Sequence, residues 1–143
     1  MPKGSDGGGA VLNLGVLNVV GCSFDHNTAF SGAAILNYAV LNLTDSVLHS
    51  NLALAWGGAI FSYPGAKLVI KSCSIVNNRA LGGIAALAVH GNSTIMNTDI
   101  SNNVGMKYGA VFTGAEADGS VTLRLANCTV SDNNSTDLAV VVC

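Results

Sequence analysis

The sequence predicts an all-β protein, a right-handed single-stranded parallel β-helix (a solenoid) of about five coils. Two observations predict this fold. A short pattern that closes on Asn recurs five times along the 143-residue chain, and Gly-rich corners with short apolar strands lie between the copies. The closing asparagines are 24, 27, 25 and 30 residues apart, so each coil takes 24–30 residues.

The recurring pattern is what predicts the strands. Each copy reads apolar, any, apolar, any, small or Asn/Asp, Cys/Ser/Thr, any, apolar, any, any, Asn, and only Ser93 departs from the opening apolar position. Alternation of this kind indicates β-strands, which Gly, Asn and Ser separate. The copies are Leu17–Asn27, Leu41–Asn51, Leu68–Asn78, Ser93–Asn103 and Leu123–Asn133. The strands between copies begin at Ala10, Ala34, Ala59, Ala85 and Ala110.

The fixed spacing distinguishes a parallel solenoid from a set of hairpins. Antiparallel hairpins alternate in direction and do not bring like residues to like positions. In a parallel solenoid each coil stacks about 4.8 Å above the last, so like residues form ladders. We expect an inward ladder of Leu12, Leu36, Phe61, Leu87 and Phe112. We also expect a structural Asn ladder at one corner, of Asn27, Asn51, Asn78, Asn103 and Asn133, because Asn tolerates left-handed corners and bonds its amide to the next Asn.

Composition limits the function classes. The chain is 50% hydrophobic and 10% charged, with 17 Gly and 2 Pro, which is too apolar for disorder and too rich in Gly for a helical bundle. A net charge of −2 supplies no field that would capture nucleic acid. No apolar run approaches the roughly 20 residues of a membrane span, and the N-terminus has no hydrophobic signal-peptide segment.

Two short motifs carry a resemblance to a known family. They are Gly-Gly-Ala-aliphatic, at Gly8–Val11 and Gly57–Ile60, and Phe-x-x-Asn, at Phe24–Asn27. In the other coils Leu48, Ile75, Ile100 and Val130 replace the Phe, and Ile84 follows Gly82-Gly83 in place of Ala. The pair resembles the repeats of polymorphic outer-membrane-protein-type β-helices. The resemblance implies a cell-surface passenger domain with an adhesive or structural role, and it brings no catalytic residues.

Cysteine and acidic residues favour structural roles. Cys22, Cys73 and Cys128 fall in one column, two coils or about 9.6 Å apart, which is too far for a disulfide. Without a Cys-x-x-Cys or a His cluster we expect no metal and no cofactor. No column brings two carboxylates together for glycosidic acid–base chemistry, and Asp25–His49 is the one suggestive pair. We therefore expect no catalytic residues.

A third ladder offers a possible partner surface. If Ala10, Leu12 and Leu14 point inward, an aliphatic strip points outward, which suggests a contact face, because parallel strands that are apolar on both faces are normally covered on both. The alternative is that the corner turns this column inward. The strip comprises Val11, Ile35, Ile60, Ala86 and Val111.

Five Asn-x-Ser/Thr sequons are possible N-glycosylation sites in a eukaryotic secretory route, with Asn92 and Asn134 expected at corners as the best acceptors. The sequons begin at Asn42, Asn92, Asn127, Asn133 and Asn134.

These observations predict a non-enzymatic extracellular or cell-surface protein, structural or adhesive. Residues 1–143 form a single β-helix segment, and Val140–Cys143 matches the start of a sixth coil without a polar cap. We therefore expect part of a longer solenoid or an end-to-end, filament-forming assembly, because uncapped solenoid ends expose unpaired backbone. The expected partners are other copies of the chain, glycans or cell-surface ligands, and neither nucleic acid nor a spanned membrane. The alternative is a segment of a pectate-lyase-like carbohydrate-active enzyme with its catalytic coils elsewhere.

Overall fold

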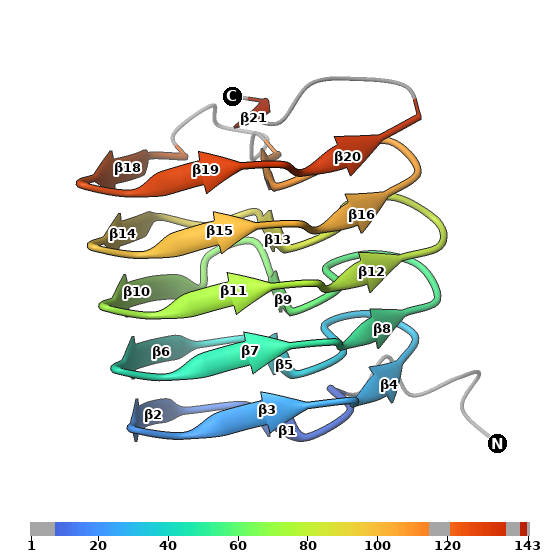
Figure 1. Cartoon of the computed structure of the whole chain (residues 1–143). Coiled ribbons are helices and arrows are strands. Elements are labelled where there is room, and N and C mark those ends of the chain that lie inside the picture. The colour runs from blue at the N-terminus through green and yellow to red at the C-terminus, as the bar shows by residue number, and fades with distance from the viewer. Residues whose placement is uncertain (1–7, 115–120, 137–140, 143) are drawn as a thin grey trace, which may run out of the picture.

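The computed structural model describes residues 8–114, 121–136 and 141–142, and these ranges contain strands and turns but no helix. The strands form four parallel sheets, each named here by its first strand (Figure 1). The β1 sheet holds β1 (Val11–Asn13), β5 (Ile35–Asn37), β9 (Ile60–Ser62), β13 (Leu87–Val89), β17 (Val111–Thr113) and β21 (Val141–Val142). The β2 sheet holds β2 (Val16–Val20), β6 (Val40–Thr44), β10 (Lys67–Lys71), β14 (Ser93–Met96) and β18 (Leu123–Ala126).

The other two sheets follow the same order. The β3 sheet holds β3 (Ser23–Asp25), β7 (Val47–His49), β11 (Ser74–Val76), β15 (Asp99–Ser101) and β19 (Thr129–Ser131). The β4 sheet holds β4 (Thr28–Ala29), β8 (Leu52–Ala53), β12 (Arg79–Ala80), β16 (Val104–Gly105) and β20 (Asn134–Ser135). Each strand therefore pairs with the strand one coil before and one coil after it. In Figure 1 the chain crosses the front from β3 to β4, returns behind and arrives one strand higher, which is a right-handed path. The predicted parallel β-helix is confirmed.

The corners on either side of the β3 sheet share one backbone conformation. The residue that links the β2 and β3 sheets has positive φ in every coil, and so does the residue that links the β3 and β4 sheets. The first set is Gly21, Asp45, Ser72, Asn97 and Asn127, and the second is His26, Ser50, Asn77, Asn102 and Asp132. Gly, Asn and Asp enter this left-handed region most readily, so local propensity and coil geometry agree at most of these corners. The left-handed residue is thus the one before each ladder asparagine, not the ladder asparagine itself.

The five asparagines form a continuous hydrogen-bonded ladder. The backbone N–H of Asn51 donates to Asn78 Oδ1 at 3.1 Å, and Asn51 Nδ2 donates to the same oxygen at 2.9 Å. Asn51 Nδ2 also donates to the carbonyl oxygen of Phe24, at 3.0 Å. Each side chain thus joins its own coil to both neighbours. The same double donation links Asn27 to Asn51, Asn78 to Asn103 and Asn103 to Asn133.

The core lies inside the coils and consists of aliphatic layers. The strands β6, β10 and β14 of the β2 sheet alternate strictly, so that in β6 Leu41 and Leu43 are fully buried while their neighbours are partly exposed. Ile75 and Ile100 fill the same role in the β3 sheet. Complete burial of each such side chain contributes about 1.5–3 kcal/mol. The stacked aliphatic layers are therefore a main source of stability.

The predicted partner strip is wrong, because these residues belong to the core. Ile35, Ile60, Ala86 and Val111 are fully buried, and Val11, in the first coil, is partly buried against them. In the three-residue strands of the β1 sheet the first and third residues point inward and the middle one outward. The predicted inward ladder is therefore reversed at four positions, because Leu12, Leu36, Phe61 and Phe112 are the middle residues of their strands.

The reversal has a physical cause in the polar residues of these strands. Asn13 and Asn37 are polar but point inward, where Asn13 Nδ2 donates to Asn37 Oδ1 at 2.8 Å and Asn37 Nδ2 donates to Ser62 Oγ at 3.1 Å. A buried polar row that satisfies itself looks in the sequence like a solvent face. Leu87 is the exception and points inward as predicted, because it pairs with Ile60 and Val111, one residue away from the predicted Leu87–Phe61 match.

The ladder makes the first prediction. Asn78→Ala removes two acceptor and two donor interactions at a fully buried site. It leaves the donors of Asn51 unsatisfied, so we expect a loss of about 3–5 kcal/mol of unfolding free energy. Urea denaturation measures it. The matched control is Asn42→Ala, whose side chain donates once, to Asn18 Oδ1, and which we expect to cost under about 1 kcal/mol. Equal losses for the two variants would contradict the ladder.

The buried strip makes the second prediction. Ile60→Asp places a carboxylate in a fully apolar layer, so we expect destabilisation on the order of 4 kcal/mol or more, or no folding. Val69→Asp, on the outward side of β10 at 36% exposure, is the control, and we expect a change within about 0.5 kcal/mol. Circular dichroism melts compare them. An Ile60→Asp protein that melts like the parent would restore the exposed strip.

Candidate functional site

The outward side of the β1 sheet carries aromatic side chains in place of the polar ones expected on a solvated face. Phe61 and Phe112 are middle residues of β9 and β17, and Ala88 lies between them on β13. Residues that immediately follow the strands flank this column on one side, and residues of the corner before the strands flank it on the other. We call the following set the aromatic face: Tyr38, Trp56, Phe61, Tyr63, His90, Tyr108 and Phe112.

Ring contacts run along the aromatic face from coil to coil. Tyr38 and Tyr63 stack with centroids 4.0 Å apart, and Phe61 meets Tyr63 edge-on at 4.9 Å. Tyr108 and Phe112 stack at 4.7 Å. His90 lies between Phe61 and Phe112, with its ring centroid 5.2 Å and 5.8 Å from theirs. Contacts of this kind add about 0.5–1.5 kcal/mol each beyond burial, so the rings hold one another in place.

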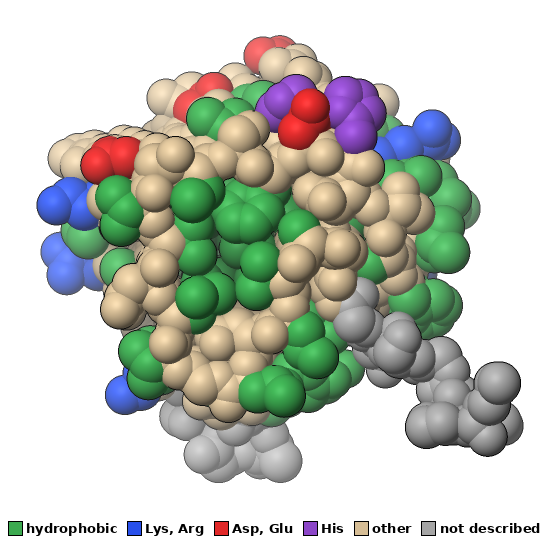
Figure 2. All heavy atoms as spheres, turned by 90° about the horizontal axis from the view of Figure 1, so that it is seen from below, with side chains coloured by type: hydrophobic (Ala, Val, Ile, Leu, Met, Phe, Trp, Pro, Cys, Tyr) green, Lys and Arg blue, Asp and Glu red, His purple; other side chains and the backbone are tan. Residues whose placement is uncertain are grey.

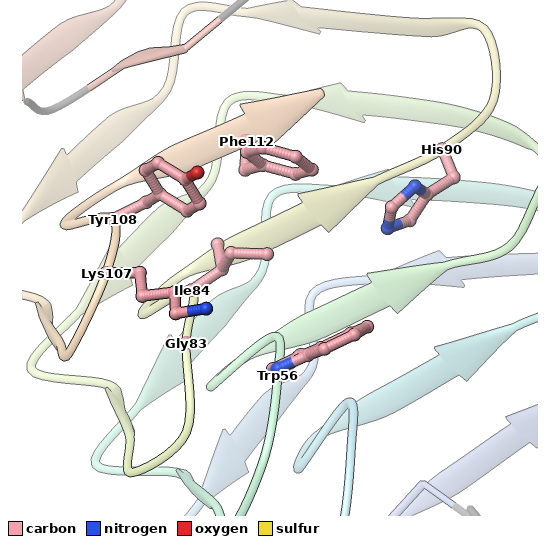
Figure 3. Close-up of a pocket in the computed structure, with 7 residues that line it drawn as sticks. All are labelled: Trp56, Gly83, Ile84, His90, Lys107, Tyr108 and Phe112. Carbon is pink, nitrogen blue, oxygen red and sulfur yellow. The ribbon is translucent and has the colours of Figure 1, made fainter. Parts of the chain in front are cut away.

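Trp56 separates two open cavities on this face. The first, of about 200 Å³, is lined by Trp56, Gly83, Ile84, His90, Lys107, Tyr108 and Phe112 (Figure 3). The second, of about 230 Å³, lies on the other side and is lined by Phe30, Ser31, Ala55, Trp56, Phe61 and Tyr63. In Figure 3 the indole lies at one side of the first cavity and the rings of Tyr108 and Phe112 at the other. Trp56 keeps 47% of its surface exposed.

The backbone of the neighbouring coil fits closely around the indole. A Cβ atom at Gly83 would lie 2.6 Å from Cδ1 of Trp56, so glycine is required there for the indole to keep its position. Ile84 forms an isolated parallel bridge with Tyr108, which fixes the corner above the cavity. The sequence therefore positions Trp56 by contacts from the following coil.

The charges near the aromatic face are few. Lys107, an exposed residue, brings an ammonium group to the first cavity. The described aspartates lie in the β3 sheet or in the corners at its ends, and none of them lines either cavity. They are Asp25, Asp45, Asp99 and Asp132. Within the described residues, the site is an apolar surface with hydroxyl, indole N–H and ammonium donors at its rim.

Sequence analysis missed this site. It placed Phe61 and Phe112 inside the coil because large apolar side chains usually lie there. A usable signal was present: Tyr38 and Tyr63 directly follow β5 and β9, and Tyr108 lies in the corner before β17.

The Asp25–His49 pair is a surface cluster at the end of the coil stack. His49 Nδ1 lies 3.2 Å from Asp25 Oδ1, and His26 Nδ1 contacts the same carboxylate oxygen. Figure 2 shows this red and purple group at the rim, beside the hydrophobic centre of the stack. Ser50 Oγ lies 3.2 Å from His49 Nδ1, the same ring nitrogen that faces Asp25. A catalytic triad uses opposite ring nitrogens for the acid and the nucleophile, so this group lacks that geometry.

The cysteine column is structural. Cys22, Cys73 and Cys128 are free, and each thiol donates to the carbonyl oxygen two residues earlier, as the hydroxyls of Ser46 and Thr98 do. Burial raises the pKa of the Cys73 thiol, which keeps it protonated and able to donate. The fourth cysteine, Cys143, lies outside the described residues.

The sequons divide into two groups. Asn92, Asn127 and Asn134 are exposed. Asn92 lies at a corner, as expected, whereas Asn134 lies in β20. The amide of Asn133 donates to the carbonyl oxygen of Ile100 at 2.8 Å, and that of Asn42 donates to Asn18. Three sequons are thus accessible in the folded chain, and two use the amide that would carry a glycan.

A second exposed apolar surface follows the β4 sheet. It consists of the residue that directly follows the β4-sheet strand in each of four successive coils. We call this set the apolar stripe: Phe30, Leu54, Leu81 and Met106, whose exposed fractions are 54%, 50%, 38% and 54%.

Comparison of the chain with models of protein families, with curated proteins and with solved structures found no match. The resemblance to polymorphic outer-membrane-protein-type repeats therefore stays a prediction. Within the described ranges, His, Cys, Asp and Glu form no group of three that would hold a metal ion. The same part of the chain contains no helix long and apolar enough to cross a membrane.

Proposed function

We propose that this protein is a non-enzymatic extracellular β-helix, structural and adhesive, that binds its partner on the aromatic face. One observation carries the proposal: on the outward side of the β1 sheet, the rings of Tyr38 and Trp56 are exposed to solvent beside a cluster of packed aromatic rings, although the core on the inward side is already filled. Tyr38 and Trp56 are 41% and 47% exposed. Exposed apolar surface gathered on one face is characteristic of a contact site.

The chemistry of the face suits adhesion. Tyr and Trp supply large contact areas with few rotatable bonds and are enriched at protein interfaces, where they dominate binding energy. Ring stacking and the close fit of Gly83 around Trp56 hold the rings before a partner arrives. A pre-ordered surface loses little entropy on binding.

The apolar stripe supports self-association as a second part of the same role. Its four side chains line up along the coil axis, so two copies placed side by side would bury Leu54 and Leu81 along their length. Lateral contact of this kind is compatible with a filament or a wall layer. The stripe adjoins the aromatic face at Phe30, which also lines the second cavity beside Trp56. End-to-end contact between copies of the chain is also proposed, on the sequence argument that uncapped solenoid ends expose unpaired backbone.

The proposal predicts adhesion that depends on the aromatic face. Beads coated with the chain are expected to adhere to cultured epithelial cells or to immobilised fibronectin, laminin or collagen. The Tyr38→Ala/Trp56→Ala variant is expected to lower adhesion at least tenfold, because interface aromatics are worth about 2 kcal/mol or more each. Val69→Ala, which shortens an exposed side chain on the β2 sheet, is the matched control.

Three outcomes decide the proposal. Adhesion lost in the double variant and kept in the control supports it. A parent chain that adheres to none of these surfaces and sediments as a monomer contradicts it. Release of reducing ends from polygalacturonate by the parent chain contradicts it in favour of the carbohydrate-active enzyme, and loss of this release in Asp25→Ala would assign the activity to the Asp25–His49 group.

A further inference from the structure

The two cavities on either side of Trp56 have the size of single rings. Each measures about 200–230 Å³, whereas pockets for a whole drug-sized ligand occupy about 300–1,000 Å³. They share the indole of Trp56 as a common wall and lie one after the other along the coil axis, since one is lined by Phe61 and the other by Phe112. Two small compartments in a row fit two consecutive units of a chain molecule.

A small residue in the outward column opens the first cavity. Phe61 and Phe112 belong to coils two apart, at about 9.6 Å, and the coil between them presents only the methyl group of Ala88. A large side chain there would continue the ring stack. With Ala88, the space between these rings stays open, and Ile84, His90, Trp56 and Tyr108 are among the residues that line it.

The lining combines flat apolar surfaces with polar groups at their edges. The first cavity lies between the indole on one side and the rings of Tyr108 and Phe112 on the other (Figure 3). The Tyr108 hydroxyl and the Lys107 ammonium group supply polar atoms there, and the Ser31 hydroxyl supplies one to the second cavity. Trp56 adds an indole N–H. A ligand that fits must offer a flat apolar face and a polar edge in each unit.

We infer that the aromatic face binds an oligosaccharide of pyranose rings that runs along the coil axis, with one ring in each cavity beside Trp56. A pyranose ring has a C–H face, which packs on an aromatic ring, and hydroxyl groups at its edge, which bond to donors such as Lys107 and Tyr108. A fatty-acyl chain would leave those donors unsatisfied. The inference rests on the proposed function and names the class of its ligand.

The single tryptophan of the chain reports on this site directly. Because the chain contains one Trp, any change in indole fluorescence on ligand addition comes from Trp56. The probes are cellohexaose, hexa-N-acetylchitohexaose and hexagalacturonate, each added up to 10 mM. We expect at least one to shift the emission and to bind at least tenfold more tightly than its monosaccharide, since the two cavities are linked through one ligand.

Two variants separate the site from the fold. Trp56→Ala, followed by calorimetry, is expected to weaken binding at least tenfold. Gly83→Ala keeps the indole but places a methyl group 2.6 Å from Cδ1 of Trp56, so it is expected to weaken binding at least threefold and to change the emission of the free protein. Val69→Ala is expected to bind as the parent does. Thermal melts establish that each variant is folded.

The sugar class follows from Lys107. If Lys107→Gln weakens hexagalacturonate binding but not that of cellohexaose, the ammonium group selects acidic sugars. If it weakens both equally, the group bonds to sugar hydroxyls, and either result supports a sugar ring in the first cavity.

Two results would overturn the inference: no fluorescence or heat signal with any of the three probes, or binding that Trp56→Ala leaves unchanged. Adhesion to matrix proteins that still depends on Tyr38 and Trp56 would then leave the proposed function standing with a protein partner.

Discussion

The hydrogen bonds between consecutive asparagines are the interaction on which the rest of this structure depends. At the corner where the chain turns from the β3 sheet into the β4 sheet, the backbone N–H of one Asn points along the coil axis and the side-chain oxygen of the next Asn receives it. The amide nitrogen of the same side chain returns to a carbonyl oxygen of the coil below, as from Asn78 to Leu48. Every coil must therefore bring an Asn to this point, whatever the length of its loops.

That requirement explains why loop lengths vary without disturbing the sheets. Coils of 24 and 30 residues stack equally well, because the ladder and the left-handed corners around the β3 sheet set the register and the remaining corners absorb the difference. Once the register is set, outward side chains of successive coils also align. The aromatic face and the apolar stripe are such columns: their side chains are neighbours because their coils are stacked in register, not because they are close in sequence. The same regularity that stabilises the core thus produces an extended binding surface.

The sequence was sufficient for the parts of the fold that repeat simply. The parallel arrangement and the Asn27–Asn133 ladder follow from one spacing that only stacked coils satisfy, and the alternation in Leu41–Thr44 identifies its buried side because polar and apolar residues take separate faces. The β1 sheet could not be assigned in this way. Both of its faces are largely apolar, and the polar residues Asn13 and Asn37 are buried by bonding to each other, so polarity pointed to the wrong face.

The candidate site was lost for the same reason. Phe61 and Phe112 were assigned to the core, and the cavities beside Trp56 depend on a one-residue difference in register near Ala88 and on the fit of Gly83 against the indole. Neither can be read from spacing alone, because both arise from contacts between coils. The sequence does contain the aromatic residues beside these strands. They indicate an aromatic outer face only once it is known which residues of the β1 sheet point inward.

Hydrogen exchange of the asparagine side chains, followed residue by residue by NMR, tests the ladder most directly. The side-chain amide protons of Asn51, Asn78 and Asn103 are predicted to exchange as slowly as the backbone amides of β6 and β11, because they are released only when the coils separate. Those of Asn92 and Asn127, which are exposed, are predicted to exchange at the rate of a free amide. Rapid exchange at Asn78, equal to that at Asn127, would contradict the account.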